Sequence, residues 1–176
     1  MPERIREDMV ALLPRLRRFA LTLCGSSDEA DDLVQAACER ALSRLNQFEP
    51  GTRLDSWMFR IVQTTWIDRT RSAARRETVT DTEVIESIPA NTRLAEQTEA
   101  RQSLALVRDE IAKLPEEQRA VLGLVTIDGL SYQDAANVLG VPIGTVMSRL
   151  ARARKKLATA IDPQASPRLY HHGQTV

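Results

Sequence analysis

The amino-acid sequence predicts an all-helical protein in which a flexible linker joins two small helical domains, the second of them a helix-turn-helix. Aromatic residues make up only 4% of the chain, and no alternating run of Val, Ile and Thr is bounded by turns, so strands have little support. Apolar residues instead recur at three- and four-residue spacing, the period of an amphipathic helix. A chain of 176 residues is long enough for one compact domain or two small ones, and we expect two.

The first expected helices lie in the N-terminal part of the chain. One begins near Ile5 and stops at Gly25, because glycine ends helices readily. The next begins at Ser26 or Ser27, whose hydroxyl can cap it, and continues through Leu45. Its opening letters, SSDEADD, place acids at the positive end of the helix dipole, which favours a helix start.

A turn-rich loop, NQFEPGTRL, follows, since its Pro and Gly break any helix. The third helix, SWMFRIVQTTWIDRTRSAARR, begins near Asp55 or Ser56. The next residues, TVTDTEVIESIPANTR, are polar, weakly acidic and without an amphipathic period, which is typical of a linker. We therefore expect a first domain at 1–77, a linker at 78–93, a second domain at 94–162 and a loose tail at 163–176.

The second domain is expected to contain a helix-turn-helix. A helix from near Leu94 ends before Pro115, and another, with Pro115 in its first turn, ends at Gly129. Ser131 can then cap the short helix SYQDAANVL, which Gly140 closes. The following Val-Pro pair starts the last helix at a sharp angle, as a helix-turn-helix requires.

That last helix has one apolar stripe and a basic opposite face. Val146, Leu150, Ala153 and Leu157 recur at four, three and four, while residues 145–161 contain bases and no acid. Exposed hydroxyls and guanidinium groups suit the major groove, where Arg can pair with guanine through two hydrogen bonds. The alternative is a solvated basic face on a helical bundle, but that explains neither the capped helix before it nor the absence of acids.

Several function classes have no support in the sequence. No stretch of about 18 apolar residues occurs, so we expect a cytoplasmic protein without membrane insertion. Cys24 and Cys38 have no Cys or His neighbours at ligand spacing, so we expect small buried side chains and neither a metal site nor a disulfide. No catalytic residue and no cofactor is expected.

Two long motifs resemble the extracytoplasmic-function sigma factors of the sigma-70 family. LPEEQRAVLGLVTIDGLSYQDAANVLGVPIGTVMSRLARARKKL is similar to their promoter-binding C-terminal domain. DEADDLVQAACERALSRLNQF resembles their polymerase-binding helix, and FEPGTRLDSWMFRIVQTTWIDRTRSAARR resembles their promoter-melting element. The resemblance covers nearly the whole chain, in the family's order, and the last motif also resembles the general-stress group.

The resemblance implies a protein that binds core RNA polymerase and promoter DNA, as duplex upstream and as single strand downstream, and that an anti-sigma factor inhibits. It assigns upstream-element contacts to Thr145, Ser148, Arg149, Arg152, Lys155 and Lys156. Downstream-element contacts fall to Phe48, Arg53, Arg60, Thr64, Arg69, Arg71, Arg75 and Arg76. Polymerase contacts fall to Asp31, Asp32, Leu33, Gln35, Glu39 and Arg40.

Two other functions remain open on the sequence. One is a sigma-like adaptor that sequesters an anti-sigma factor, although the receiver domain usual in such adaptors is absent from this sequence. The other is a helix-turn-helix repressor with a ligand-sensing N-terminal domain, although an acidic helix, a Pro-Gly loop and an arginine-rich helix are not typical of a sensor.

Overall fold

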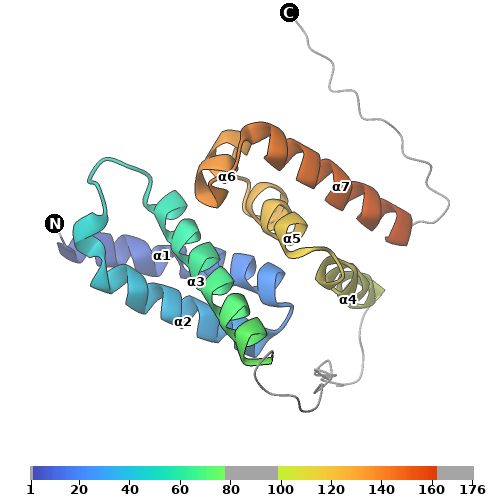
Figure 1. Ribbon diagram of the computed structural model, residues 1–176, viewed down its shortest axis with the longest axis horizontal. Helices are drawn as coiled ribbons and strands as arrows, with labels where there is room; N and C mark the ends of the chain where they lie inside the picture. The colour runs from blue at the N-terminus through green and yellow to red at the C-terminus, as the bar shows by residue number, and fades with distance from the viewer. Residues whose placement is uncertain (1, 78–98, 162–176) are drawn as a thin grey trace, which may run out of the picture.

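The computed structural model describes residues 2–77 and 99–161, and the regular structure throughout these residues is helical (Figure 1). The expected linker at 78–93 and the expected tail at 163–176 lie outside the described residues. The elements are α1 (Pro2–Cys24), α2 (Ser27–Ser43), the short 3-10 helix η1 (Leu45–Gln47), α3 (Leu54–Glu77), α4 (Glu99–Ala112), α5 (Glu116–Leu122), the π-helical turn η2 (Gly123–Ile127), α6 (Tyr132–Leu139) and α7 (Ile143–Ile161).

Helix ends follow the local signals in the sequence closely. Gly25 follows the last residue of α1 with a φ of 77°, a left-handed conformation that glycine adopts without strain. Ser26 occupies the N-cap position of α2, although its side chain makes no capping hydrogen bond to the helix. α2 ends at Ser43, slightly before the expected Leu45, where the chain tightens into η1.

Helices α1, α2 and α3 form the N-terminal unit, and large apolar side chains fill the space between them. Leu16, Phe19, Leu33 and Phe59 are completely buried there. The rings of Phe19 and Phe59 meet edge to face, with centroids 5.4 Å apart and planes at 89°, a favourable geometry for aromatic pairs. This packing ties α1 to α3 and fixes the direction of the long arginine-rich α3.

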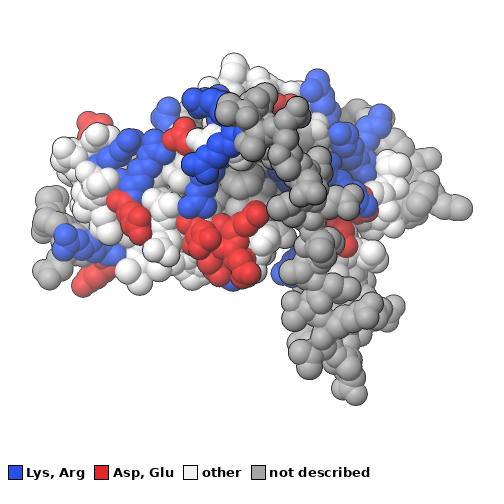
Figure 2. Space-filling model, turned by 60° about the horizontal axis from the view of Figure 1, so that its bottom comes forward, with Lys and Arg blue, Asp and Glu red and all other residues white. Residues whose placement is uncertain are grey.

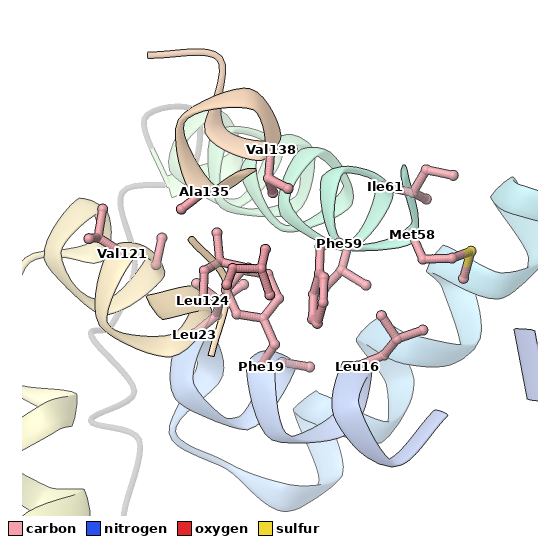
Figure 3. Packing of buried hydrophobic residues seen from close by; sticks show 14 of the residues in the cluster. Leu16, Phe19, Leu23, Met58, Phe59, Ile61, Val121, Leu124, Ala135 and Val138 are labelled. Atoms are coloured by element: carbon pink, nitrogen blue, oxygen red, sulfur yellow. The ribbon is translucent and has the colours of Figure 1, made fainter. Parts of the chain in front are cut away.

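Helices α4, α5, α6 and α7, with η2, form the C-terminal unit, and the two units share one continuous core. α3 packs against α6, while α1 packs against α5 and η2. Figure 3 shows Phe19 and Leu23 of α1 facing Leu124 of η2, with Val138 of α6 lying over α3. We call this contact zone between the two units the seam. Because of it, the expected DNA-binding residues of α3 and those of α7 belong to units that pack against each other.

Gly123 allows α1 to approach η2 closely. A Cβ atom on Gly123 would lie 3.0 Å from Cδ2 of Phe19 and 3.3 Å from Cγ2 of Thr22, tighter than ordinary contact. The helix expected to run from Pro115 to Gly129 changes at Gly123 into a π-helical turn, and Pro115 itself is the N-cap of α5 and not its first residue. Gly129 ends the segment with a φ of 72°, as expected.

Candidate functional site

The helix-turn-helix consists of α6 and α7, and its geometry follows from local capping. The Ser131 hydroxyl accepts a hydrogen bond of 3.0 Å from the backbone N–H of Asp134, which caps α6. Gly140 ends α6 in the left-handed region, at φ 66° and ψ 36°. Ala135 and Ala136 are buried, and their small side chains let α6 pack closely on α3. The expected turn is thus confirmed in its residues and geometry.

One face of α7 is buried and the other carries cations. Val146, Leu150 and Ala153 are buried, whereas Ser148, Arg152, Lys155 and Lys156 are exposed and Thr145 is half-buried. Among the described residues, no acid lies within ion-pair distance of Arg152, Lys155 or Lys156. This face can therefore offer charge to an external anion.

Arg149 differs from its neighbours on α7. Its Nη2 lies 3.3 Å from Oε2 of Glu117 on α5, and only 23% of its side chain is exposed. Arg149 also lines a cavity of about 460 Å³ between α3 and the C-terminal unit, together with Gln63, Arg71 and Glu116. The structure therefore shows this expected base contact of α7 mostly buried and paired with the carboxylate of Glu117.

The Pro-Gly loop between η1 and α3 is built around a glycine turn and an aromatic pair. Gly51 has a φ of 93°, and the ring centroids of Phe48 and Trp57 lie 5.3 Å apart. Arg53, at the end of this loop, donates to Oδ2 of Asp55 at 2.8 Å and to Oδ2 of Asp134 on α6 at 2.5 Å. An expected DNA contact of the N-terminal unit is thus bound to an acid of the C-terminal unit.

Asp55 collects hydrogen bonds from several donors at the start of α3. The largest effect on its pKa comes from the Arg53 guanidinium, with further hydrogen bonds from the Ser56 backbone N–H and from Arg15. Together these outweigh partial burial and lower the pKa of Asp55 to about 2. The carboxylate therefore stays ionised and holds the Arg53 side chain through most of the acidic range.

The remaining expected downstream contacts lie along α3. Arg60 and Arg71 are exposed, as are Arg75 and Arg76, which have interaction partners of their own. Arg69 is exposed and donates to the backbone oxygen of Asp32 at 3.0 Å. Thr64 is half-buried, with its hydroxyl bonded to the Ile61 carbonyl at 3.1 Å. Figure 2 shows basic side chains interspersed with acidic ones on the face it presents, with the largest acidic group below the centre of the view.

The expected polymerase-binding residues lie on α2. Asp31, Asp32, Gln35 and Glu39 are exposed, and Arg40 is half-buried and pairs with Asp68 at 2.7 Å. Leu33, however, is completely buried, so in this structure its side chain packs in the core and offers no external contact.

One exposed acid of α2 is already paired within the N-terminal unit. Arg17 donates to Oδ1 of Asp31 at 2.6 Å, and this hydrogen bond lowers the pKa of Asp31. About half of each side chain is exposed to solvent, so an external cation can compete for the carboxylate.

Sequence reasoning missed the acids that hold expected DNA contacts. Glu117 lies in the first turn of α5, and Asp134 takes part in the cap of α6. Their second roles depend on contacts with Arg149, 32 residues away, and with Arg53, 81 residues away. No local pattern marks such pairs.

Other kinds of site are not formed by the described residues. No group of His, Cys, Asp and Glu there could hold a metal ion, and no helix there is long and apolar enough to cross a membrane. Cys24 is half-buried, and burial raises the pKa of its thiol to about 12, which makes it a poor nucleophile.

The chain matches two families and known proteins over most of its length. Residues 9–76 match Sigma-70 region 2, and residues 104–157 match Sigma-70, region 4. The chain is 38% identical over 166 residues to the ECF RNA polymerase sigma factor EcfG of Rhodopseudomonas palustris (strain TIE-1), covering 92% of this chain and 87% of that protein. It is 32% identical over 150 residues to the ECF RNA polymerase sigma-E factor of Escherichia coli (strain K12), covering 78% and 76%.

Solved structures agree with these matches. The sigma factor RpoE, in a complex with the anti-sigma factor NepR from Bartonella quintana, is similar with a TM-score of 0.79 and 29% identity over 93% of this chain and 99% of that one. The PhyRSL–NepR complex from Sphingomonas sp. Fr1, at 24% identity over 96% of each chain, has a TM-score of 0.59 and shows the fold alone. Both sigma-70 regions occur in order along an all-helical chain, which therefore belongs to the extracytoplasmic-function (ECF) sigma factors of the sigma-70 family, transcription initiation factors and not enzymes.

Proposed function

We propose that this chain binds core RNA polymerase in the cytoplasm through α2 and reads promoter DNA with two separate surfaces. The exposed face of α7 contacts the upstream element as duplex. The Pro-Gly loop and α3 contact the downstream element as a single strand. This division assigns duplex recognition to the region expected at 94–162 and strand opening to that expected at 1–77.

The exposed face of α7 is the observation that carries the proposal. A capped helix and a left-handed glycine set the angle of α7, and its stripe of buried residues fixes which side faces out. Arg152 then presents an unpaired guanidinium group among the described residues, and such a fork can donate two hydrogen bonds to O6 and N7 of guanine. Lys155 and Lys156 add positive charge for the DNA backbone.

The N-terminal unit supports single-strand binding through its aromatic and basic residues. Unstacked bases bind on aromatic faces, and Phe48 and Trp57 form a half-buried aromatic pair beside the loop. The exposed Arg60 and Arg71 extend positive charge along α3, which suits a phosphate backbone. The rigid Pro-Gly turn reduces the entropy lost when the loop binds a base.

The exposed part of α2 supports the polymerase contact. Asp32, Gln35 and Glu39 lie on its outer surface, and Gln35 donates to Glu39 at 3.1 Å, which orders both side chains. An anti-sigma factor is a further partner that we propose. The sigma factor RpoE of Bartonella quintana, 29% identical to this chain, was solved in complex with the anti-sigma factor NepR, and CnrH, 26% identical, was solved in complex with the cytosolic domain of CnrY.

Run-off transcription tests the proposal. Purified chain is added to sigma-free core RNA polymerase on genomic DNA fragments, in parallel with the variants Arg149→Ala and Arg152→Ala. We expect new start sites with the wild-type chain and their loss in the variants. Arg154→Ala is the matched control, because Arg154 is exposed on the same helix but, two residues on, projects from a different side than Arg152. Failure of the chain to associate with core polymerase would contradict the proposal and favour the adaptor or the repressor.

A further inference from the structure

A continuous chain of ion pairs crosses the seam beside the apolar core. Asp128 of the C-terminal unit lies 3.3 Å from Arg18 and 3.8 Å from Arg15 of α1. Arg15 lies 3.3 Å from Asp55, and Asp55 lies 2.8 Å from Arg53. Arg53 also pairs with Asp134 of the C-terminal unit, at 2.5 Å. We call these residues the seam network; it comprises Arg15, Arg18, Arg53, Asp55, Asp128 and Asp134.

The first end of the seam network is buried. The side chain of Asp128 has no exposed surface, and both of its guanidinium partners belong to the other unit. Arg15 is held in addition over the ring of Phe59, with its Cζ atom 5.3 Å from the ring centroid. Burial raises the pKa of Asp128 in spite of these two cations, and its Oδ2 atom accepts no hydrogen bond from the described residues. This end of the seam network therefore adds little net stability to the closed arrangement, and the Arg53 end carries the contact between the units.

The second end of the seam network ties up Arg53. Its guanidinium group uses one edge for Asp55 and its remaining Nη1 for Asp134. Asp134 is itself oriented by the Ser131 hydroxyl, which donates to the same Oδ2 atom at 2.8 Å. Three of the five N–H donors of the guanidinium group are engaged, and the two carboxylates neutralise its charge, so Arg53 attracts a phosphate less than a free guanidinium group would.

From this geometry we propose that the seam network holds the two units together and keeps Arg53 from promoter DNA, so that the Arg53–Asp134 pair must break before Arg53 contacts the downstream element. This inference rests on the proposed role of Arg53 in DNA binding. It makes Asp134 an internal competitor of the DNA phosphate. Closure of the chain and binding of the downstream strand then exclude each other at this residue.

The test removes the Asp134 charge without removing the cap of α6. Asp134→Asn keeps the backbone N–H that Ser131 binds, and the Asn side-chain oxygen can still accept from the Ser131 hydroxyl. The matched control is Glu110→Gln, which removes one acid from the same unit but breaks only its pair with Lys113, the residue after α4, at 2.7 Å. Both variants change the net charge equally, so a general electrostatic effect on DNA binding cancels between them.

The first readout is the distance between the units. Dyes are attached at cysteines introduced at the exposed Asn46 and Ala158 of the full chain, with Cys24 and Cys38 replaced by Ala, and single-molecule energy transfer gives the fraction of open molecules. We expect Asp134→Asn to raise the open-to-closed ratio by about two- to fivefold, the range for one partly exposed ion pair, and Glu110→Gln to leave it unchanged. An unchanged ratio in Asp134→Asn would overturn the proposal.

The second readout is binding of a short fluorescent single-stranded oligonucleotide, measured by anisotropy. We expect Asp134→Asn to bind about two- to fivefold more tightly than Glu110→Gln, and Arg53→Ala in the Asp134→Asn background to remove the gain. Opening without that gain would overturn the competition at Arg53. Run-off transcription with wild-type chain is independent of both readouts, so it distinguishes failure of this inference from failure of the proposed function.

Exchanging the charges of Arg53 and Asp134 distinguishes loss of their ion pair from misfolding of a single variant. Arg53→Glu alone should open the chain, and Arg53→Glu combined with Asp134→Arg should restore closure. Restored closure supports the direct pair, whereas no restoration in a chain with wild-type helix content would count against it.

Discussion

The exposed face of α7 and the Pro-Gly loop carry the same kind of residue for the same proposed purpose, yet their cations are in different states. Arg152 and Lys156 face solvent without an acid in ion-pair distance among the described residues, whereas Arg53 is bound to two aspartates. The difference shows that a basic residue suited to DNA can be available or occupied, depending on which acids the fold brings to it.

The reason lies in how each segment packs. α7 packs through its stripe of buried residues, and residues 145–161 contain no acid that could turn back onto its exposed face. The Pro-Gly loop lies beside the seam, where α6 of the other unit supplies Asp134. Arg149 is intermediate between these cases, since it belongs to α7 but reaches Glu117.

The largest expected effect comes from breaking the seam, because the seam brings Asp134 to Arg53 and so makes the Pro-Gly loop differ from the exposed face of α7. Gly123→Val places branched methyl groups where even a Cβ would lie 3.0 Å from the Phe19 ring, so α1 and η2 must separate. We expect a loss of about 3 kcal/mol in the free energy of unfolding, measured by urea denaturation.

Gly144→Ala is the control for that substitution. A Cβ at Gly144 meets nothing within 4 Å, and the residue lies in α7. We expect a gain of roughly 0.5–1 kcal/mol there, because Ala favours the helix. Equal losses in both variants would mean that the seam is not a specific contact.

The next effect concerns the available surface. Arg152→Ala should weaken binding to the promoter duplex by about 2 kcal/mol, or roughly thirtyfold, and should lower the salt dependence of binding if a phosphate contact is also lost. Arg154→Ala serves as the matched control in the same filter-binding or anisotropy titration. Wild-type affinity in Arg152→Ala would remove this residue from the interface.

Much of the fold could be predicted from the sequence, because its signals are local. Gly25 and Gly140 end helices, Ser131 caps one, and spacing alone identified the buried stripe of α7. The sequence gives no local signal for the π-helical turn at Gly123, and the close approach of Phe19 to Gly123 joins residues of distant helices.

Part of the candidate site could likewise be predicted from local sequence signals, and part could not. The face of α7 follows from helical periodicity, so its residues could be named in advance. The pairing of Arg53 with Asp134 joins residues 81 positions apart, and its existence depends on how the two units meet. The complete burial of Leu33, expected as a polymerase contact, likewise follows from tertiary packing.

The smallest expected effect is the pH dependence of the folding stability that comes from Asp55, the partner of Arg53. The pKa of Asp55 is about 2 in the folded chain and about 3.9 in an unfolded one, so its ionised form stabilises the fold above about pH 4. That contribution is lost as the pH falls from about 4 toward 2. Solvent screening keeps it below about 1 kcal/mol.

An NMR titration of the Asp55 carboxyl group checks this. In the Arg53→Ala variant we expect its pKa to rise toward the ordinary value, because the largest cause of the shift is removed. A pKa that stays near 2 in the variant would show that Arg15 and the Ser56 N–H hold the carboxylate without Arg53.

The division of work between the two surfaces is tested most directly by permanganate footprinting of promoter DNA bound to core polymerase and this chain. Permanganate modifies unpaired thymines, so it reports strand opening, and DNase I footprinting of the same complexes reports protection of the upstream duplex. We expect Arg152→Ala to abolish both upstream protection and opening, and Arg60→Ala with Arg71→Ala to keep upstream protection while losing opening. Loss of upstream protection in the α3 variant, or full opening in it, would contradict the assignment of duplex reading to α7 and single-strand binding to α3.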